Sequence, residues 1–310
     1  MHFKSNHWAI IIGASGGIGM ATAEKLAQHG MNLCLVHRDR RGAMANIGLQ
    51  FEKLRAQGIK TLSFNCDALS QDGRKEVLDS LTNEMGQNGK VRMVLHALAL
   101  GNLKLLAPSL SPRFPEQVFA KLAESLNRTP EEIKDAFQGV LNTGEARLYP
   151  FLDPAYNQDA FLDQDDFKHT LHAMGVNIVE WVKDLFDRTL FAEDARVLTL
   201  TSEGNQVAWK GYAAVSAAKA VLESLSRSMA VEFGPYGIRS NVIQAGVTDT
   251  AALRMIPGNE RIKAQALLRN PMGRLTLPGD VANAIYLLCT DEAAWINGAL
   301  ICVDGGERIA

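Results

Sequence analysis

Short apolar runs alternate with stretches of helical periodicity along most of the chain. The apolar runs predict strands at 8–12, 31–36, 61–65, 92–96, 196–200, 239–244 and 299–303. The stretches between them predict helices at about 17–29, 43–57, 71–86, 170–191, 213–233 and 279–290. Strands that are almost wholly apolar and alternate with helices are typical of a parallel sheet covered on both faces. We therefore predict an α/β fold with a doubly wound sheet of seven parallel strands.

The stretch 103–166 departs from this alternation. It holds six of the ten prolines of the chain. One helix is predicted over about 115–126, and a second opens at Thr129-Pro130, with Thr129 as N-cap and Pro130 at the first helical position. The second helix is expected to end near Gly144. We interpret 103–166 as a largely helical insertion after the fourth strand, within a single domain that covers 1–310.

Composition and charge narrow the class of protein. Lys and Arg number 32 against 34 Asp and Glu, so bulk charge gives no reason to expect a nucleic acid or membrane partner. No apolar run approaches the roughly 18 residues that span a bilayer. The four cysteines lie far apart in apolar runs, which predicts reduced thiols and no metal site. The opening residues run directly into a strand, so we expect no signal peptide and a cytoplasmic protein.

A glycine-rich loop joins the first predicted strand to the first predicted helix. Glycines there allow a tight turn and let backbone N–H groups approach a pyrophosphate, and the helix N-terminus adds partial positive charge. The pattern favours a Rossmann-like dinucleotide site, with an ordinary glycine-rich turn as the alternative. The loop residues expected to hold the cofactor are Gly13, Ser15, Gly16, Gly17, Ile18 and Gly19.

The end of the second strand favours NADP(H) over NAD(H). An NAD site usually has an acidic residue there, whereas this chain has His37 and Arg38. A guanidinium group can pair with a 2′-phosphate, although a solvated basic turn is the alternative. Asp67 and Ala68 follow the third strand, and we expect the Asp67 carboxylate to accept a hydrogen bond from the adenine amine.

Ser202, Tyr212 and Lys219 follow the fifth strand and enter a long helix. Together with the glycine loop, the exit of the sixth strand at 244–250 and the segment 303–306, they resemble the short-chain dehydrogenase/reductase family. The resemblance covers nearly the whole chain outside 103–166. The common family pattern is Tyr-x3-Lys, but Val215 stands four residues before Lys219. Tyr212 gives a Tyr-x6-Lys spacing instead, which is similar to the NADPH-using enoyl-acyl-carrier-protein reductase branch.

The resemblance implies a role for each member of this set. Tyr212 would donate a hydrogen bond to an enolate oxygen, and Lys219 would bind the nicotinamide ribose. Ser202 would support the tyrosine or the substrate oxygen. Seven residues advance a helix by about 700°, so a helix regular from Tyr212 would place both side chains on one face. This spacing also moves the hydroxyl about 4.5 Å along the axis relative to the common one, which suits charge on a thioester oxygen. The alternative for each residue taken alone is an ordinary structural role. Tyr212 would be an aromatic residue at a helix start, Lys219 a solvated helix charge and Ser202 a strand-end cap.

The same resemblance extends the cofactor site to two further strand ends. His96 and Ala97 close the fourth strand in a form similar to enoyl reductases, and are expected to contact the cofactor. After the sixth strand, Gly246, Thr248 and Thr250 would hold the carboxamide and the phosphates. The apolar stretch 251–258 that follows predicts a lid over an acyl chain, with an ordinary packed helix as the alternative. The family resemblance also implies a homodimer or homotetramer.

Three functions remain open on this reading. The first is NADPH-dependent reduction of an enoyl thioester in fatty-acid synthesis, with the acyl group possibly on acyl carrier protein. The second is a carbonyl or 3-oxoacyl reductase, against which the missing hydroxyl at Val215 counts. The third is an NADP-sensing protein without turnover, against which the intact Ser202, Tyr212 and Lys219 count.

Overall fold

A computed structural model describes residues 3–109, 114–142, 148 and 156–310. Seven parallel strands form one sheet in the order β3-β2-β1-β4-β5-β6-β7. The strands are β1 (His7–Ile12), β2 (Asn32–His37), β3 (Thr61–Asn65), β4 (Lys90–His96), β5 (Phe191–Thr201), β6 (Ile238–Ala245) and β7 (Leu300–Val303). This confirms the predicted doubly wound sheet of seven strands. The strand order reverses between β1 and β4, and ligands of such sheets bind at the carboxyl ends beside this point.

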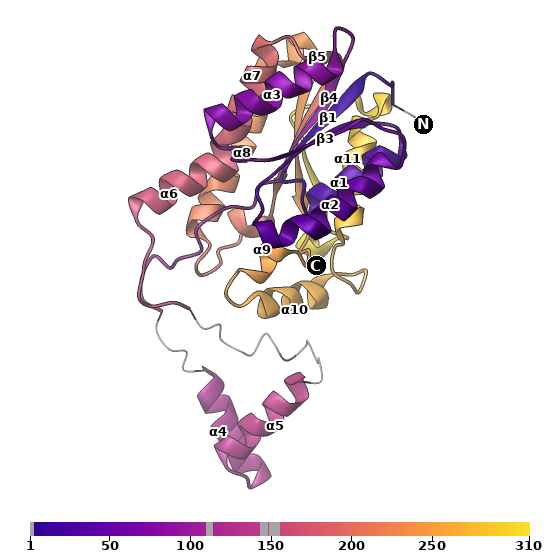
Figure 1. Ribbon diagram of the computed structural model, residues 1–310. Helices are drawn as coiled ribbons and strands as arrows, with labels where there is room; N and C mark the ends of the chain where they lie inside the picture. The colour runs from indigo at the N-terminus through magenta and orange to yellow at the C-terminus, as the bar shows by residue number, and fades with distance from the viewer. Residues whose placement is uncertain (1–2, 110–113, 143–147, 149–155) are drawn as a thin grey trace.

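Helices cover both faces of the sheet (Figure 1). One face is covered by α1 (Gly17–Gln28), α2 (Arg41–Arg55) and α11 (Pro278–Cys289). The other is covered by α3 (Gln71–Met85), α7 (Asn177–Asp187) and α8 (Ala213–Glu232). Successive strand residues serve opposite faces, so Ile10 and Ile12 belong to one core cluster and Ala9 and Ile11 to the other. This two-sided burial is why the strands are continuous apolar runs rather than alternating ones.

The helix predicted over 170–191 is divided in two. α6 (Gln164–Leu171) begins earlier than predicted, because Asp163 and Asp166 form a capping box at its start. A π-helical turn, η2 (His172–Val176), then separates α6 from α7. At Gly175 a Cβ atom would lie 3.0 Å from the carbonyl oxygen of Ala218 on α8. The π-helical turn therefore packs closely against α8. π-helical turns are frequent near functional sites.

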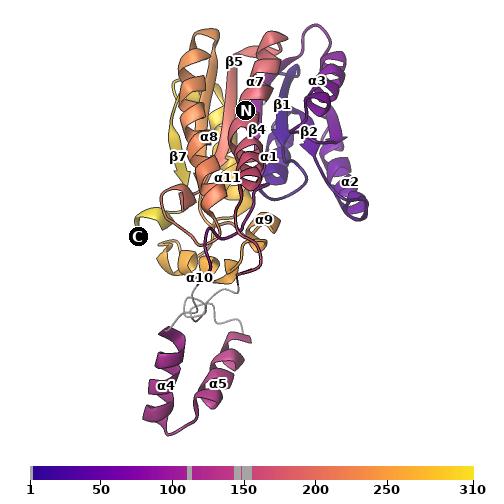
Figure 2. The same cartoon turned by 90° about the vertical axis from the view of Figure 1, so that its left-hand side faces the viewer.

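The insertion contributes two helices between β4 and β5. α4 (Phe114–Leu126) and α5 (Pro130–Asn142) lie side by side and away from the sheet (Figures 1 and 2). Phe119 and Phe137 meet edge to face, with ring centroids 5.3 Å apart. Both predicted helix starts are confirmed to within one residue, whereas the end predicted near Gly144 falls outside the described residues. The assignment of the insertion to a single domain stays a prediction.

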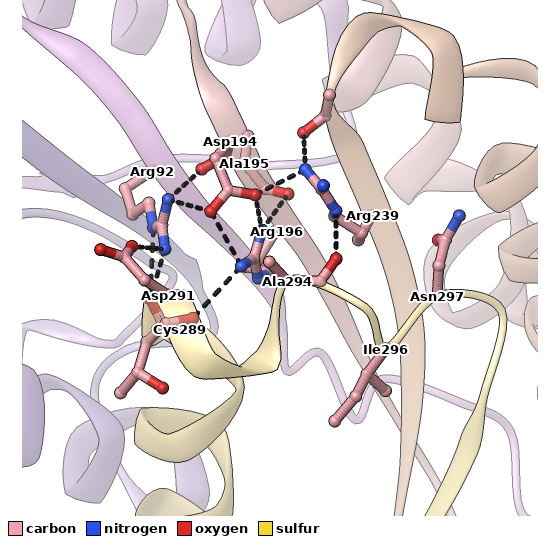
Figure 3. A network of polar contacts seen from close by, with 12 residues as sticks. Arg92, Asp194, Ala195, Arg196, Arg239, Cys289, Asp291, Ala294, Ile296 and Asn297 are labelled. Atoms are coloured by element: carbon pink, nitrogen blue, oxygen red, sulfur yellow. Dashed lines mark hydrogen bonds and ion pairs between the residues drawn. The ribbon is translucent and has the colours of Figure 1, made fainter.

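A network of arginines ties the amino ends of β4, β5 and β6 to the end of α11 (Figure 3). Asp194 accepts hydrogen bonds from Arg92 at 2.6 Å and Arg239 at 2.5 Å, and also pairs with Arg196. Burial opposes the charge of Asp194, but Arg196 and Arg92 outweigh it and hold its pKa below the usual value. The buried guanidinium groups also donate to backbone carbonyls at the end of α11, including that of Cys289. The network thus fixes the end of the sheet opposite the candidate site.

Three findings concern membrane spans, metal sites and cysteines. Within the described residues, no helix is both long and apolar enough to cross a bilayer. The same part of the chain brings no three His, Cys, Asp or Glu side chains close enough together to hold a metal ion. The four cysteines are free thiols.

Candidate active site

A cavity of about 210 Å³ opens at the carboxyl edge of the sheet. Most of its wall is apolar, and the polar exceptions come from the loops after β5, β6 and β7. The side chains and glycines that line it include Ile18, Met174, Ser202, Glu203, Tyr212, Val215, Gly246, Thr248, Thr250, Leu253, Ile262 and Glu307. The predicted serine, tyrosine and several predicted cofactor residues therefore share one cavity.

Ser202 and Tyr212 lie next to each other in this cavity. The Ser202 Oγ and the Tyr212 hydroxyl oxygen are 3.4 Å apart. The tyrosine ring lies against Gly204, where an added Cβ would be 2.5 Å from Tyr212 Cε1. Burial raises the pKa of the Tyr212 phenol, and the hydrogen bond with Ser202 opposes this only in part. The phenol is therefore protonated at neutral pH and available as a hydrogen-bond donor.

The helical geometry assumed for Tyr212 is wrong at that residue. α8 begins at Ala213, and Tyr212 is its N-cap with φ −113° and ψ 3°. Gly211 before it has φ 74°, a left-handed conformation that favours glycine. The turn at Gly211 thus sets the direction of the Tyr212 ring. The regular helix that carries Lys219 begins only at Ala213 and does not include Tyr212.

Lys219 is buried on α8 beneath the end of β5. Its Nζ donates a hydrogen bond of 2.7 Å to the carbonyl oxygen of Leu200. Burial lowers the pKa of Lys219 to about 8, against the opposing charge of Glu223. Glu223 in turn accepts hydrogen bonds from Thr201 and Asn205. The lysine is therefore held in place, and its charge is sensitive to pH close to neutrality.

The glycine loop forms a cradle that side chains would fill. Gly13 has φ 96°, and a Cβ there would lie 2.7 Å from the carbonyl oxygen of Ala97. A Cβ at Gly19 would lie 2.0 Å from the carbonyl oxygen of Gly13. Gly17 faces Thr250, whose Cγ2 would be 3.2 Å from an added Cβ. The loop, the end of β4 and the exit of β6 thus converge at the N-terminus of α1, an arrangement that fits a dinucleotide pyrophosphate.

At the end of β2 the two predicted residues have different surroundings. The Arg38 side chain is 67% exposed, and its Nη1 lies 3.6 Å from Asp67 Oδ2. Arg38 and Asp67, which are both predicted to bind the adenosine half of the cofactor, therefore lie side by side. The His37 side chain is only 2% exposed, with Nδ1 2.8 Å from Asp39 Oδ2 and its ring edge-on to Phe51. The His37 imidazole is thus engaged inside the protein rather than displayed beside Arg38.

His96 and Ala68 are also buried. The carbonyl oxygen of Ala68 accepts hydrogen bonds from Trp181 Nε1 at 3.1 Å and Asn177 Nδ2 at 3.3 Å. His96 is 1% exposed, and neither ring nitrogen has a hydrogen-bond partner among the described residues. Burial and the charge of Lys219 lower the pKa of His96 to about 3, so its imidazole is neutral. Thr199, opposite His96 on β5, likewise has an unpartnered Oγ1 within the described part of the chain.

Two further helices form the outer wall of the cavity. They are α9 (Ala251–Arg254), which Thr250 caps, and α10 (Asn259–Arg269). The predicted lid stretch contributes Ala252, Leu253 and Ile256 to the lining. The stretch is therefore a packed wall of the cavity here, and its movement stays a prediction.

Three charged residues beside the cavity form a cluster that the sequence did not predict. Arg269 Nη2 lies 2.5 Å from Glu203 Oε1 and 3.3 Å from Glu307 Oε1. Both carboxylates line the cavity, and Glu307 is 2% exposed. The three are distant along the chain and follow no motif, so only the position of Glu203 beside Ser202 offered a signal.

The fold and the site together define an NAD(P)-dependent oxidoreductase. A family model described as "Enoyl-(Acyl carrier protein) reductase" matches residues 152–307, and one described as "KR domain" matches residues 8–127. The first match covers half of the chain. The chain therefore belongs to the short-chain dehydrogenase/reductase family, with similarity to enoyl-acyl-carrier-protein reductases.

Individual relatives agree with this family but differ in their activities. The chain is 26% identical over 299 residues to the cis-4-hydroxycyclohexanecarboxylate dehydrogenase of Sinomonas cyclohexanicum, covering 96% of this chain and 95% of that protein. It is 37% identical over 123 residues to the enoyl-[acyl-carrier-protein] reductase [NADH] FabI of Salmonella typhimurium, covering 40% of this chain and 47% of that protein. The crystal structure of FabI from Candidatus Liberibacter asiaticus matches with a TM-score of 0.72 at 18% identity, covering 99% and 96% of the two chains. That likeness shows the shared fold.

Proposed function

We propose that this protein is an NADPH-dependent enoyl-thioester reductase of fatty-acid synthesis. The observation that carries the proposal is the pair of Tyr212 and Ser202 in the cavity, at the Tyr-x6-Lys spacing from Lys219. The position four residues before the lysine is Val215, which lines the same cavity and has no hydroxyl group. A carbonyl reductase of the common type would need its proton donor there.

The proposed cofactor is NADPH. The cradle formed by Gly13, Gly17 and Gly19 suits the pyrophosphate, because backbone N–H groups at the start of a helix attract phosphate. Arg38 is exposed at the end of β2, where its guanidinium can pair with a 2′-phosphate. Asp67 beside it is an acceptor for the adenine amine. A solved short-chain dehydrogenase from Burkholderia cenocepacia with the same fold was crystallised with NADP.

When bound, NADPH would supply a hydride to the β-carbon of the enoyl group, and a proton from solvent would complete the reduction at the α-carbon. Tyr212 donates a hydrogen bond to the thioester oxygen, where negative charge develops, because its raised pKa keeps the phenol protonated. Lys219 carries a positive charge below about pH 8 and favours the same negative charge through space. Ser202 holds the Tyr212 hydroxyl in place from 3.4 Å.

A carbonyl reductase is the second candidate. The relative that covers 96% of this chain is named a dehydrogenase of a hydroxycyclohexanecarboxylate, a secondary alcohol. In that function Tyr212 would give its proton to the oxygen of the substrate carbonyl itself. Turnover of a ketone in place of an enoyl thioester separates the two.

We also propose a homo-oligomer and a substrate delivered on acyl carrier protein. The exposed apolar side chains near β7, the last strand of the sheet, include Leu287 at 62%, Trp295 at 96% and Leu300 at 41%. Large apolar side chains that are exposed and close together in the sequence suit contact with a second copy of the chain. The carrier is proposed from the family resemblance.

Replacing the phenol tests the proposed role of Tyr212. We expect Tyr212→Phe to reduce kcat on trans-2-butenoyl thioester by at least 100-fold while the NADPH Kd changes less than threefold, because the lost hydroxyl acts on developing charge. Tyr236→Phe removes a hydroxyl from a residue that is 61% exposed and serves as control. Wild-type kcat in Tyr212→Phe would remove Tyr212 from the mechanism.

A further inference from the structure

One arginine joins three loops at the carboxyl edge of the sheet. Arg269 is the last residue of α10, whose residue Ile262 lines the cavity. Its Nη2 reaches Glu203 in the loop after β5 and Glu307 in the turn after β7, at 2.5 Å and 3.3 Å. None of these three side chains takes part in the chemistry proposed for Tyr212.

Glu203 connects this arginine to the catalytic pair. It directly follows Ser202, and its carbonyl oxygen accepts hydrogen bonds from the N–H groups of Gln206 at 2.8 Å and Val207 at 2.9 Å, in a tight 3-10 turn. Gly204, the next residue, lies so close to Tyr212 that a Cβ would be 2.5 Å from the ring. A displacement of Glu203 therefore changes the position of Ser202 and the support of the Tyr212 ring together.

Glu307 connects the same arginine to the cofactor side of the cavity. It is 2% exposed, and its Oε2 accepts a hydrogen bond of 3.1 Å from the N–H of Val247. Val247 begins the segment that carries Thr248 and Thr250. Burial, together with the charges of Glu203 and Asp304, raises the pKa of Glu307. The guanidinium of Arg269 is the charge that offsets the two carboxylates at this place.

We propose that Arg269 is a positioning residue that couples helix α10 to the Ser202–Tyr212 pair through Glu203 and Glu307. The inference rests on the active site in the proposed function. A substrate held against Ile262 on α10 then acts on the loop that carries Ser202. Without the guanidinium, two carboxylates at the cavity wall repel each other and the three loops separate. Lysine keeps the charge but lacks the planar fork, so it restores the coupling in part.

Hydrogen exchange tests the coupling without any substrate. In Arg269→Met we expect backbone amides of both 203–212 and 259–269 to exchange at least tenfold faster than in the wild type, with Arg269→Lys in between. Arg274→Met is the matched control, since it removes an arginine whose ion pair with Asp280 at 2.6 Å lies away from the cavity lining. Faster exchange confined to α10 would overturn the proposal.

Steady-state kinetics give the second readout. With trans-2-butenoyl thioester and NADPH, we expect kcat of Arg269→Met to fall at least tenfold with KM changed less than threefold, and Arg269→Lys to recover most of kcat. A kcat within twofold of the wild type would overturn the coupling. If the wild-type protein does not turn over this substrate, the proposed function fails, and hydrogen exchange alone decides on Arg269.

Discussion

Lys219 is buried at the site and Tyr212 is partly buried, and the loss of water shifts both pKa values in directions that suit the proposed chemistry. Burial raises the pKa of the phenol, which stays a donor, and lowers the pKa of the ammonium group to about 8. Loss of water also strengthens the interaction of each group with charge that develops in the cavity. The sequence identified both residues from their spacing, but not the turn at Gly211 that aims the ring, because that turn depends on contacts with a distant loop.

The lowered pKa of Lys219 predicts an alkaline loss of activity. In the proposed mechanism the ammonium form is the active one, so we expect kcat to fall as pH rises through about 8. Lys219→Arg keeps its charge at all accessible pH values, and any residual activity it has should show no loss in this range. A pH profile of kcat from about 6 to about 10 spans this lowered pKa and ends just below the ordinary lysine pKa of about 10.4. A wild-type profile that stays flat beyond pH 9 would contradict the assigned role.

The proposed preference for NADPH rests on Arg38. We expect Arg38→Ala to weaken NADPH binding by roughly 10- to 100-fold, the usual worth of a charge-assisted hydrogen bond, and NADH binding by less than about twofold. Fluorescence titration of both cofactors gives the two values. Arg55→Ala removes the same charge from the far end of α2 and is the control. Equal weakening of NADPH and NADH would exclude a 2′-phosphate contact.

At the scale of elements, strands were the easier part to predict. The centres of the five inner strands, β2, β1, β4, β5 and β6, are buried on both faces, so the apolar runs mark them directly. β5 is longer than predicted because it begins at Phe191 and includes the polar residues Glu193 and Asp194. The arginine network stabilises the charge of Asp194. The π-helical turn between α6 and α7 was not predicted, since it follows from packing against α8 rather than from local propensity.

Glycine-to-alanine substitutions in the glycine loop and in α2 are expected to have different effects. Gly19→Ala places a Cβ 2.0 Å from the carbonyl oxygen of Gly13, so we expect NADPH binding to weaken at least 100-fold. Gly48→Ala, inside α2, has open space around the new methyl group, and should stabilise the protein by up to about 1 kcal/mol through helix propensity. Titration with NADPH and thermal unfolding of both variants measure these effects. Tight NADPH binding by Gly19→Ala would mean that the cradle holds no pyrophosphate.

At the scale of the whole molecule, the sequence predicted the class of fold but not the cluster of Arg269, Glu203 and Glu307. Motifs reveal residues that are close together along the chain or recur in a known pattern. These three meet only because β5, α10 and the turn after β7 end at the same edge of the sheet.

The exposed apolar side chains of Leu287 on α11, Leu300 on β7 and Trp295 between them predict self-association. We expect the wild-type protein to be a dimer or tetramer in light scattering at micromolar concentration, and Trp295→Arg to shift it toward the monomer. Leu49→Arg, at a side chain 66% exposed on α2, should leave the mass unchanged. A wild-type monomer at 50 µM or so would contradict the proposal, since apolar interfaces of standard size persist at such concentrations.

The reaction proposed for this site is the reduction of an enoyl thioester. NADPH oxidation at 340 nm with trans-2-butenoyl thioester, run beside a 3-oxobutanoyl thioester, is the decisive measurement. We expect turnover of the enoyl substrate, loss of that turnover in Tyr212→Phe, and no turnover of the oxo substrate. Turnover of the oxo substrate alone would contradict the proposed reaction and assign Tyr212 to carbonyl reduction.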